Sequence, residues 1–542
     1  MRKNLEIPSG KRTKLYRFFE ILPGALSYAA IILLFVLSLI NPTMGAIYLF
    51  IIIAITLVKA IGVAYRTIQG YEVLKRVERV DWRQRVKDLE NPHEAFERLR
   101  DEESKSYGFD THVENLRMIA AMGGEFPEAG KIYHAVIMTA YNEGIEVLEP
   151  SIKAVIDTEF PNERIIFMLA YEERGGEEME KTAKILKEKY GDQFKDFILS
   201  KHPANLPGEV IGKGPNLVFA GEMLAKYVEK AKIPVEDVIV TSLDSDNRMA
   251  PKYLDAVAYE FVVHPNRQRL SYQPVSLFMN NIWDAPAPTR VIAVSNSFFN
   301  VISTMRPHAL RNFASHSQPL AALKAMGFWS KRTIVEDGHQ YWRSLFFFEG
   351  DYSVLPIRIP IYQDAVMDET FWKTVKAQFV QVRRWYYGAS DVAYVGVRLF
   401  GGKKKRGNMA VMPLFAKFWR LLDSHVTLAM MAPIVAFGGW VPMLMNASAR
   451  TMVAYSLPNV VSVVQTVASI GLLVTVLMSL QMLPKRPAKY KKGKNLLMVL
   501  QWILMPVTSI LYQSLAAFYA QTRLMLGKYM EKFDVTKKVV KK

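Results

Sequence analysis

Three short polar motifs separate apolar blocks in a fixed order: Asp244-Ser245-Asp246, Glu336-Asp337 and Gln381-Val382-Arg383-Arg384-Trp385. Two carboxylates spaced Asp-x-Asp can converge on one hard cation, and a diphosphate needs such a cation as it leaves. A positioned carboxylate can act as a general base. A cation beside a diphosphate stabilises the leaving group, and an indole face stacks on a sugar ring. Together these residue types suit chemistry on a diphosphate compound.

Each motif also has a purely structural interpretation. An isolated Asp-x-Asp is more often a turn or a helix cap. Glu336-Asp337 could be an acidic helix N-terminus favoured by the helix dipole. The third motif lies in the amphipathic stretch 371–400, which could be a membrane-surface helix. Placement of the Asp-x-Asp after a buried strand and before a helix favours the functional interpretation.

The elements that must position these motifs are those of a parallel sheet with covering helices. The predicted strands are Ala135–Tyr141, Arg164–Tyr171, Phe194–Lys201 and Asp237–Leu243, and the predicted helices are Val147–Asp157, Glu177–Tyr190, Pro215–Lys230 and Pro251–Val263. Ligands of open α/β sheets collect beyond the carboxyl ends of the strands. Tyr141-Asn142-Glu143 and Asp244-Ser245-Asp246 fall at such ends.

Apolar segments flank this polar region on both sides. Residues 25–41 and 45–63 contain no acidic residue and one base, Lys59, and each is about long enough to cross a hydrocarbon core roughly 30 Å thick. A second apolar set occupies 424–445, 456–483 and 495–525. We expect the last block to break at Pro506 into two shorter arms, which gives five or six membrane segments.

Basic residues set the expected orientation. Six of them precede the first apolar segment, which places the N-terminus and, after a helical hairpin, the large polar domain in the cytoplasm. The expected parts of the chain are a basic N-terminus (1–24), a transmembrane hairpin (25–65), a helical collar (66–130), a catalytic domain (131–368), amphipathic interfacial helices (369–420), a transmembrane region of three or four segments (421–526) and a basic tail (527–542).

The net charge of +18 is concentrated beside membrane segments. Basic residues there attract anionic lipid headgroups, so membrane lipids are the expected partner and nucleic acid is not. The absence of cysteine from the 542 residues excludes disulfides, zinc-thiolate sites and thiol catalysis.

The three motifs and their order resemble the membrane-embedded family-2 glycosyltransferases, the superfamily of cellulose, chitin and hyaluronan synthases. The resemblance covers roughly residues 130–390. It implies an α/β, GT-A-like (Rossmann-like) domain inserted between N- and C-terminal transmembrane helices. It also implies Mg²⁺ or Mn²⁺ as the cofactor, held by Asp246 and Asp244.

The same resemblance implies roles for other residues. Asp337 would be the general base within the Glu336-Asp337 pair. The residues implied at the substrate are Tyr141, Glu143, Glu172, Lys213, Asp244, Gln381, Arg384 and Trp385. Lys213, in a Lys-Gly-Pro-Asn element, would neutralise phosphate. Gln381 and Arg384 would lie on the diphosphate side, and Trp385 would contact the acceptor.

Two regions depart from the family pattern. The usual Asp-Asp-Gly-Ser after the second strand reads Ala170-Tyr171-Glu172-Glu173-Arg174-Gly175, so a carboxylate persists with different spacing. The acceptor loop reads Asn312-Phe313-Ala314-Ser315-His316-Ser317-Gln318. The resemblance therefore implies the nucleotide less strongly than it implies the metal site, and the identity of the polymer does not carry over from the family.

We expect an inverting, metal-dependent hexosyltransferase of the cytoplasmic membrane. It would move a sugar from a nucleoside diphosphate, with uridine as the first candidate base, to a growing glycan, and the product could be exported through its own helices. Two alternatives stay open: transfer of one sugar to a polyprenyl phosphate or glycolipid, and a non-catalytic membrane scaffold or export partner. The sugar, linkage, acceptor and oligomeric state are not specified by the motifs.

Overall fold

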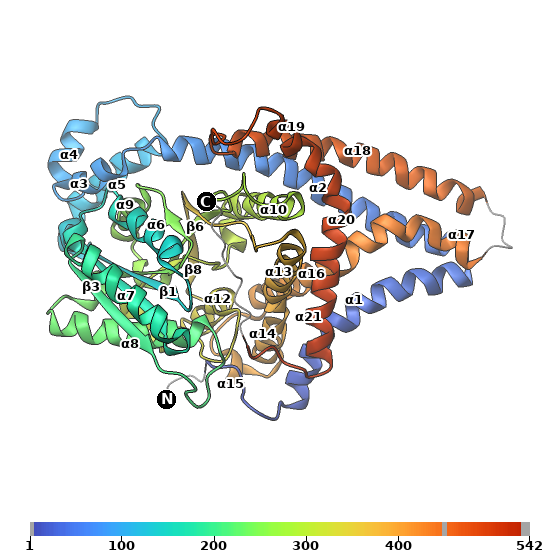
Figure 1. Ribbon diagram of the computed structural model, residues 1–542, viewed down its shortest axis with the longest axis horizontal. Helices are drawn as coiled ribbons and strands as arrows, with labels where there is room; N and C mark the ends of the chain where they lie inside the picture. Colours follow the sequence, from blue (N-terminus) through green and yellow to red (C-terminus); the bar gives the residue numbers. More distant parts are fainter. Residues whose placement is uncertain (1–4, 447–451, 533–542) are drawn as a thin grey trace.

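The apolar runs that predict strands form the core of one mixed sheet. The computed structural model describes residues 5–446 and 452–532, and its sheet domain lies at one end of the molecule (Figure 1). The strand order is β3-β2-β1-β4-β7-β6-β8-β5. The strands are β1 (Tyr133–Ala140), β2 (Ile165–Glu172), β3 (Asp196–His202), β4 (Val238–Asp244), β5 (Arg248–Met249), β6 (Leu270–Leu277), β7 (Ser317–Pro319) and β8 (Ser353–Tyr362).

The four predicted strands correspond to β1–β4, which are mutually parallel. The sheet as a whole is mixed, because β7, which was not predicted, runs antiparallel to β4 and β6, and β5 runs antiparallel to β8. The added strands lack the continuous apolar runs of β1–β4. β7 has three residues, and β6 and β8 carry proline and polar side chains.

Helices cover both faces of the parallel strands. Ala135 and Ile137 of β1 pack in one apolar cluster, and Val136 and Met138 of the same strand pack in another on the opposite face. This two-sided burial explains why the parallel strands are apolar at nearly every position. The helices of this domain are α6 (Ile145–Ile156), α7 (Gly176–Tyr190), α8 (Lys213–Lys230), α9 (Tyr253–Val263), α10 (Ala287–Thr304), α11 (Leu320–Met326) and α12 (Glu336–Phe347).

Three short helices precede the sheet: α3 (Trp82–Asp88), α4 (Pro92–Leu99) and α5 (Phe109–Met122). They pack beside α9, where the rings of Trp82 and Tyr259 lie 5.5 Å apart between centroids. His112 Nδ1 lies 3.0 Å from the Tyr259 hydroxyl, and its Nε2 lies 3.1 Å from the Asp88 carboxylate. These buried polar contacts join the helical segment to the sheet domain.

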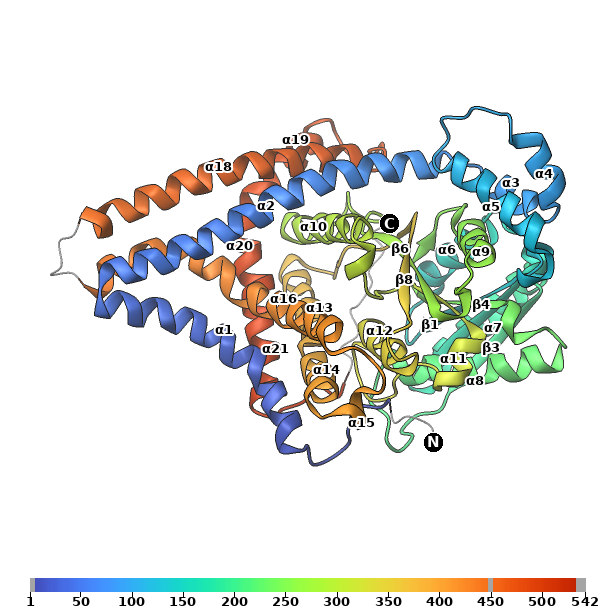
Figure 2. The ribbon, with the colours of Figure 1, turned by 180° about the vertical axis from the view of Figure 1, so that it is seen from behind.

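The stretch 371–400 forms two helices, α13 (Phe371–Tyr386) and α14 (Ser390–Phe400), joined by a 3₁₀ turn at Tyr387–Ala389. Thr370 caps α13 by accepting the backbone N–H of Lys373. Both helices lie between the sheet and the long apolar helices, and the short helix α15 (Lys403–Arg406) follows them (Figures 1 and 2).

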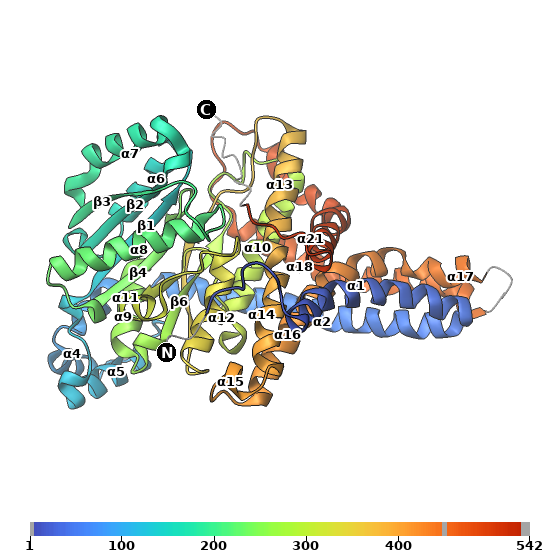
Figure 3. The ribbon, with the colours of Figure 1, turned by 90° about the horizontal axis from the view of Figure 1, so that it is seen from below.

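Four helical runs in the described residues are long and apolar enough to cross a membrane. They are α1 (Lys14–Ile40), α2 (Pro42–Glu78), the run Val411–Met445 and the run Gly493–Met525. Val411–Met445 contains α16 (Val411–Phe437) and α17 (Val441–Met445), and α18 (Met452–Met482) lies alongside α2 (Figure 1). Figure 3 shows α1, α2 and α17 extending together away from the sheet.

The last apolar block, which we expected to break at Pro506 into two shorter arms, changes direction close to that residue (Figure 1). It stays helical through α19 (Gly493–Leu500), a 3₁₀ turn (Gln501–Leu504), α20 (Met505–Thr508), a π-helical turn (Ser509–Ser514) and α21 (Leu515–Met525). The chain changes direction at the 3₁₀ turn just before Pro506, so that α20 and α21 run across α1 rather than along it (Figures 1 and 2).

Both ends of the described chain contact the sheet domain. The Tyr394 hydroxyl donates to the Leu5 carbonyl at 2.9 Å, and Glu6 forms an ion pair with Arg343. At the other end, the backbone N–H of Ile211 donates to the Glu531 carbonyl at 3.2 Å. The N-terminal segment and the segment after α21 therefore lie on the same side of the apolar helices as the sheet.

Candidate active site

The Asp-x-Asp motif forms the turn that leaves β4. Asp244 is the last residue of the strand and pairs in register with Thr139 of β1. The Asn280 side-chain amide donates to the Asp246 carbonyl at 3.0 Å, which holds the turn against the loop after β6. The turn therefore lies at the carboxyl end of the parallel strands, as the sequence predicts.

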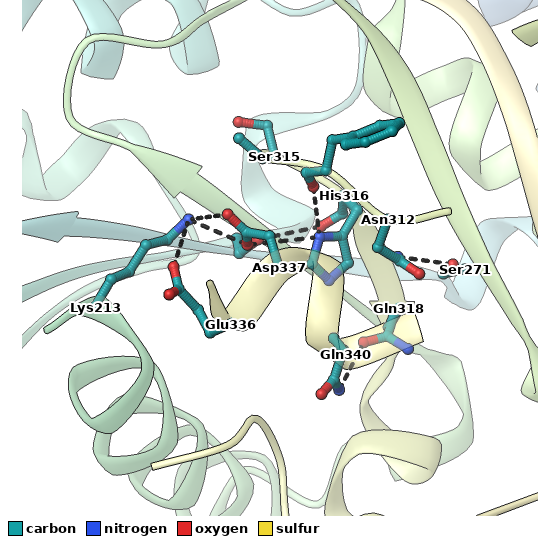
Figure 4. Close-up of polar contacts among 12 residues, drawn as sticks. Lys213, Ser271, Asn312, Ser315, His316, Gln318, Glu336, Asp337 and Gln340 are labelled. Atoms are coloured by element: carbon teal, nitrogen blue, oxygen red, sulfur yellow. Dashed lines mark hydrogen bonds and ion pairs between the residues drawn. The ribbon is translucent and has the colours of Figure 1, made fainter. Parts of the chain in front are cut away.

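Lys213 joins this turn to the second motif. Its ammonium lies 2.7 Å from Asp244 Oδ1, 3.1 Å from Asp337 Oδ2 and 3.9 Å from Glu336 Oε1. Figure 4 shows the Lys213 side chain reaching toward both residues of the Glu336-Asp337 pair. Burial lowers the pKa of the ammonium, but the three carboxylates raise it more, so the pKa lies above its ordinary value and Lys213 is charged.

The start of α8 is shaped to bring Lys213 to this place. A Cβ on Gly214 would lie 2.4 Å from the Ser330 carbonyl oxygen, so only glycine permits this approach of α8 to the segment that precedes α12. The Asn216 side-chain amide donates to the Ala170 carbonyl of β2 at 2.8 Å. Asn216 is thus a positioning residue of the Lys-Gly-Pro-Asn element.

Glu336 and Asp337 are the first two residues of α12, as predicted. Glu336 is buried, and burial together with the neighbouring Asp337 charge raises the pKa of its carboxyl above the usual range, against the opposing effect of Lys213. Glu336 is therefore protonated more readily than an ordinary glutamate. The Asp337 carboxylate is more accessible, at 19% side-chain exposure.

The predicted residues at the ends of β1 and β2 are brought together by Arg174. Arg174 forms an ion pair with Glu172, and its guanidinium lies 5.0 Å from the centre of the Tyr141 ring. A Cβ on Gly175 would lie 1.9 Å from the Tyr141 carbonyl, so this glycine lets the two strand ends approach. Sequence reasoning assigned no role to Arg174, although it lies within the segment that departs from the family pattern.

Glu143 holds the backbone of the site. Its Oε2 accepts the backbone N–H groups of Tyr141 at 2.7 Å and Asn142 at 3.2 Å, and its Oε1 accepts the Ser245 hydroxyl at 3.0 Å. The carboxylate therefore ties the turn after β1 to the Asp-x-Asp turn after β4.

The third motif is divided between two environments. The positive charge of Arg384 lowers the pKa of Glu336, against the larger effect of burial. Gln381 accepts the Gln378 amide at 3.3 Å on the same helix. Trp385 instead packs with the apolar residues beside α10, its ring 6.0 Å from that of Phe278.

His316 was not identified from the sequence, although it lies in the polar loop 312–318. Its Nδ1 is 2.9 Å from the Phe313 carbonyl oxygen and 3.8 Å from Asp337 Oδ1, and the ring is fully buried (Figure 4). Burial lowers its pKa, so the imidazole is neutral. The sequence signal that could have identified His316 was the run of polar residues at 312–318, because polar groups that become buried need hydrogen-bond partners.

A network of amides lies behind His316. The Gln340 amide donates to Gln318 Oε1 at 3.0 Å, and the Gln318 amide donates to the Ser344 and Tyr352 hydroxyls at 3.2 and 3.1 Å. The Asn312 amide donates to the Ser271 hydroxyl at 2.9 Å (Figure 4). These contacts fix the loop that carries His316 against β6 and α12.

The donor set of the site is that of a hard, oxygen-liganded cation. Within the residues that the structure describes, no group of three or more His, Asp or Glu side chains is placed to hold a metal. Asp244 and Asp246 supply two carboxylates, and Mg²⁺ commonly takes one or two carboxylates together with substrate phosphates and water. Asp244 and Asp246 therefore suit a cation that also takes ligands from a diphosphate and water. They suit less well a cation that is held by protein side chains alone.

No family model matches the chain, and no curated protein matches it. Among solved structures, a mannosyltransferase from Pyrobaculum calidifontis, in complex with GDP-Man and Mn²⁺, is similar at 13% identity and a TM-score of 0.41, covering 81% of this chain and all of that one. The structure of S. aureus TarS 1–349 is similar at 13% identity and a TM-score of 0.32, covering 73% and 93%. With UDP-GlcNAc bound, the same TarS segment gives 14% identity and a TM-score of 0.29, covering 60% and 92%. Similarity at this level does not assign a function, which has to be argued from the side chains.

Proposed function

We propose that the chain is an inverting glycosyltransferase that takes a sugar from a nucleoside diphosphate donor, with a GT-A-like sheet domain and a divalent cation as cofactor. The observation that carries the proposal is the convergence of the Asp-x-Asp turn and the Glu336-Asp337 pair on Lys213. These groups come from separate elements, and Lys213 and Asp337 are 124 residues apart in sequence. A turn or a helix cap would not need a shared cation between them.

Asp244 and Asp246 would hold Mg²⁺ or Mn²⁺, which supplies charge neutralisation for the departing diphosphate. Lys213 and Arg384 bring further positive charge to the same place, and Lys213 is already buried there. Cations positioned before the reaction stabilise developing negative charge without reorganising.

Asp337 is the proposed general base. It removes the proton from the acceptor hydroxyl as that oxygen attacks the anomeric carbon, and the bond from this carbon to the diphosphate oxygen breaks. Attack opposite to the leaving group inverts the anomeric configuration. Glu336 suits the base role less well, because its carboxyl is buried and its raised pKa leaves it largely protonated at neutral pH.

Tyr141, Glu172 and Arg174 are proposed to contact the nucleotide, since they lie at the carboxyl ends of β1 and β2 beside the Asp-x-Asp turn. Gln381 and Trp385 would act from α13, with Trp385 on the acceptor side. Trp385 packs against Phe278, so on the acceptor side it would form part of the wall along which the acceptor passes.

The long apolar helices support a membrane enzyme that extends a glycan at the cytoplasmic face, with the sheet domain and both ends of the described chain in the cytoplasm. The basic N-terminal segment favours this orientation. Apolar helices precede and follow the sheet domain along the chain. This arrangement favours a growing glycan as the acceptor over transfer of a single sugar to a lipid.

The test is to incubate purified full-length protein with a panel of nucleotide sugars and Mg²⁺ or Mn²⁺. Released nucleoside diphosphate and the size of any glycan are measured. Metal-dependent turnover to a long, glycosidase-sensitive product supports the proposal. One sugar on a lipid would select the single-transfer alternative, and donor binding without turnover, with glycan and lipid acceptors present, would favour the scaffold.

A further inference from the structure

A cavity of about 370 Å³ lies away from the cluster of charges, where the N-terminal ends of α10 and α13 meet α19. Its lining includes Arg290, Asp368, Thr370, Phe371 and Lys494. The lining residue of α13 nearest to Arg384 is Thr374, which lies 10 residues away along the helix, or about 15 Å at 1.5 Å per residue. The cavity is therefore separate from the proposed reaction centre.

The central polar group of the cavity is Arg290. Its side chain is 96% buried, with 4% exposed, on the first turn of α10. Its Nε donates to Gln501 Oε1 at 2.5 Å and its Nη1 donates to the Ala285 carbonyl at 2.7 Å. Both of these partners, an amide oxygen and a backbone carbonyl, are uncharged. A buried guanidinium stays charged, and burying it without a counter-charge is costly, so an anion in the cavity would stabilise it.

Two of the three acidic side chains of the lining, Asp284 and Glu369, form ion pairs with lysines. Asp284 forms an ion pair with Lys489 at 2.8 Å, and Glu369 forms one with Lys373 at 2.6 Å. Asp368 accepts the backbone N–H of Glu369 at 2.7 Å. The first turn of α10 adds the positive end of an 18-residue helix, with no side-chain cap on it. Arg290 and this helix end together favour an anion.

The surroundings of the cavity are apolar and exposed. Trp372 is 76% exposed beside Phe371 on α13, and Leu496 and Leu497 are 61% and 52% exposed on α19. Lys491 and Lys492 directly precede α19 in sequence. Aromatic and basic side chains of this kind gather where a protein meets the headgroup level of a bilayer.

We propose that this cavity binds the phosphate headgroup of a membrane phospholipid. Arg290 and the N-terminus of α10 hold the phosphate, Lys494 lies at the rim, and the exposed side chains of α13 and α19 contact the acyl chains. Because α13 also carries Arg384, a bound lipid would fix the helix at the bilayer surface. The site differs from that of a lipid-linked acceptor, whose reacting end would have to reach Asp337.

The experiment uses delipidated full-length protein in detergent and isothermal titration calorimetry with dihexanoyl phosphatidylglycerol. We expect the lipid to bind at one site. Arg290→Gln should lower the affinity at least about tenfold, because a charge-assisted hydrogen bond is lost. Arg290→Lys should lower it less, and Lys494→Gln should lower it about threefold, because in these variants the bond is only weakened. Lys403→Gln, in the basic helix α15 outside the cavity lining, is the matched control and should bind like the wild type.

Equal binding by wild type and Arg290→Gln, or no binding by the wild type, would overturn the proposal. Competition by inorganic phosphate as effective as by the lipid would assign the site to free phosphate instead. A clear preference for farnesyl phosphate would assign it to a polyprenyl phosphate. If Arg290→Gln fails to fold, Arg290→Lys and Lys494→Gln still decide the outcome. No nucleotide sugar is present, so the result is independent of the proposed sugar transfer.

Discussion

The ammonium of Lys213 lies 3.1 Å from the carboxylate of Asp337, although 124 residues separate them in sequence. Lys213 also contacts Asp244, so one buried cation holds the end of β4 to the start of α12. The residues proposed to bind the diphosphate and to remove the acceptor proton are thereby kept within one hydrogen-bonded cluster. Several measurements follow from this arrangement.

Lys213→Met should destabilise the protein and abolish turnover. It leaves three neighbouring carboxylates without their shared cation, and breaking a buried ion pair costs roughly 3 kcal/mol. Thermal unfolding and nucleoside diphosphate release are the measurements. Lys201→Met removes a solvent-exposed ion pair with Glu180 and should unfold at nearly the wild-type temperature. Wild-type unfolding in Lys213→Met would show that the cluster is not structural.

The pH dependence of turnover should depend on Glu336. Burial and the Asp337 charge raise its pKa, so the carboxyl is protonated below that raised pKa and gains a charge as the pH rises through it. The new charge beside Asp337 should lower the rate on the alkaline side. Glu336→Gln imitates the protonated form, so it should keep most of the neutral-pH rate and lose this alkaline decline. An unchanged alkaline limb in the variant would contradict the assignment.

Gly214→Ala should destabilise the protein strongly, although Gly214 lies within a helix. The added Cβ would lie 2.4 Å from the Ser330 carbonyl oxygen, which is backbone and cannot rotate away. We expect a loss of roughly 1–3 kcal/mol, read from chemical denaturation, and a lower affinity for the donor. Gly191→Ala is the matched control, because its φ is −57° and the new Cβ meets nothing within 4 Å. Equal stability of the two variants would rule out this close approach.

His316 should act as a positioning residue for Asp337. His316→Ala removes the ring that packs beside the carboxylate, so we expect kcat to fall by about 10- to 100-fold with the donor KM little changed. His316→Asn keeps a donor for the Phe313 carbonyl and should recover part of the rate. His308→Ala, at an exposed position, is the control. A change confined to the donor KM would place His316 at the nucleotide instead.

Much of the parallel half of the fold could be predicted from sequence. β1, β2 and β4 are buried on both faces, so they carry runs of apolar residues, and the Asp-x-Asp follows β4. The start of α12 at Glu336 also agrees with the prediction. These features depend on local patterns of residues along the chain.

The remaining features depend on contacts between distant segments. β7 has three residues and becomes a strand only by pairing with β4 and β6. Lys213 was considered for phosphate binding, but its contacts with Asp244 and Asp337 follow from the packing of α8 against Ser330. The environment of Trp385 likewise depends on Phe278, more than 100 residues earlier. No pattern within one segment specifies such contacts.

The most direct test of the central claim is sugar transfer by Asp337→Asn, assayed with the donor that the wild type uses. Asp351→Asn, which changes an exposed ion pair with Arg269, is the matched control. Loss of a general base typically costs about 10²- to 10⁴-fold. We predict a loss of that size in Asp337→Asn, with donor binding retained and the control active. Transfer at the wild-type rate by Asp337→Asn would show that this carboxylate is not the base.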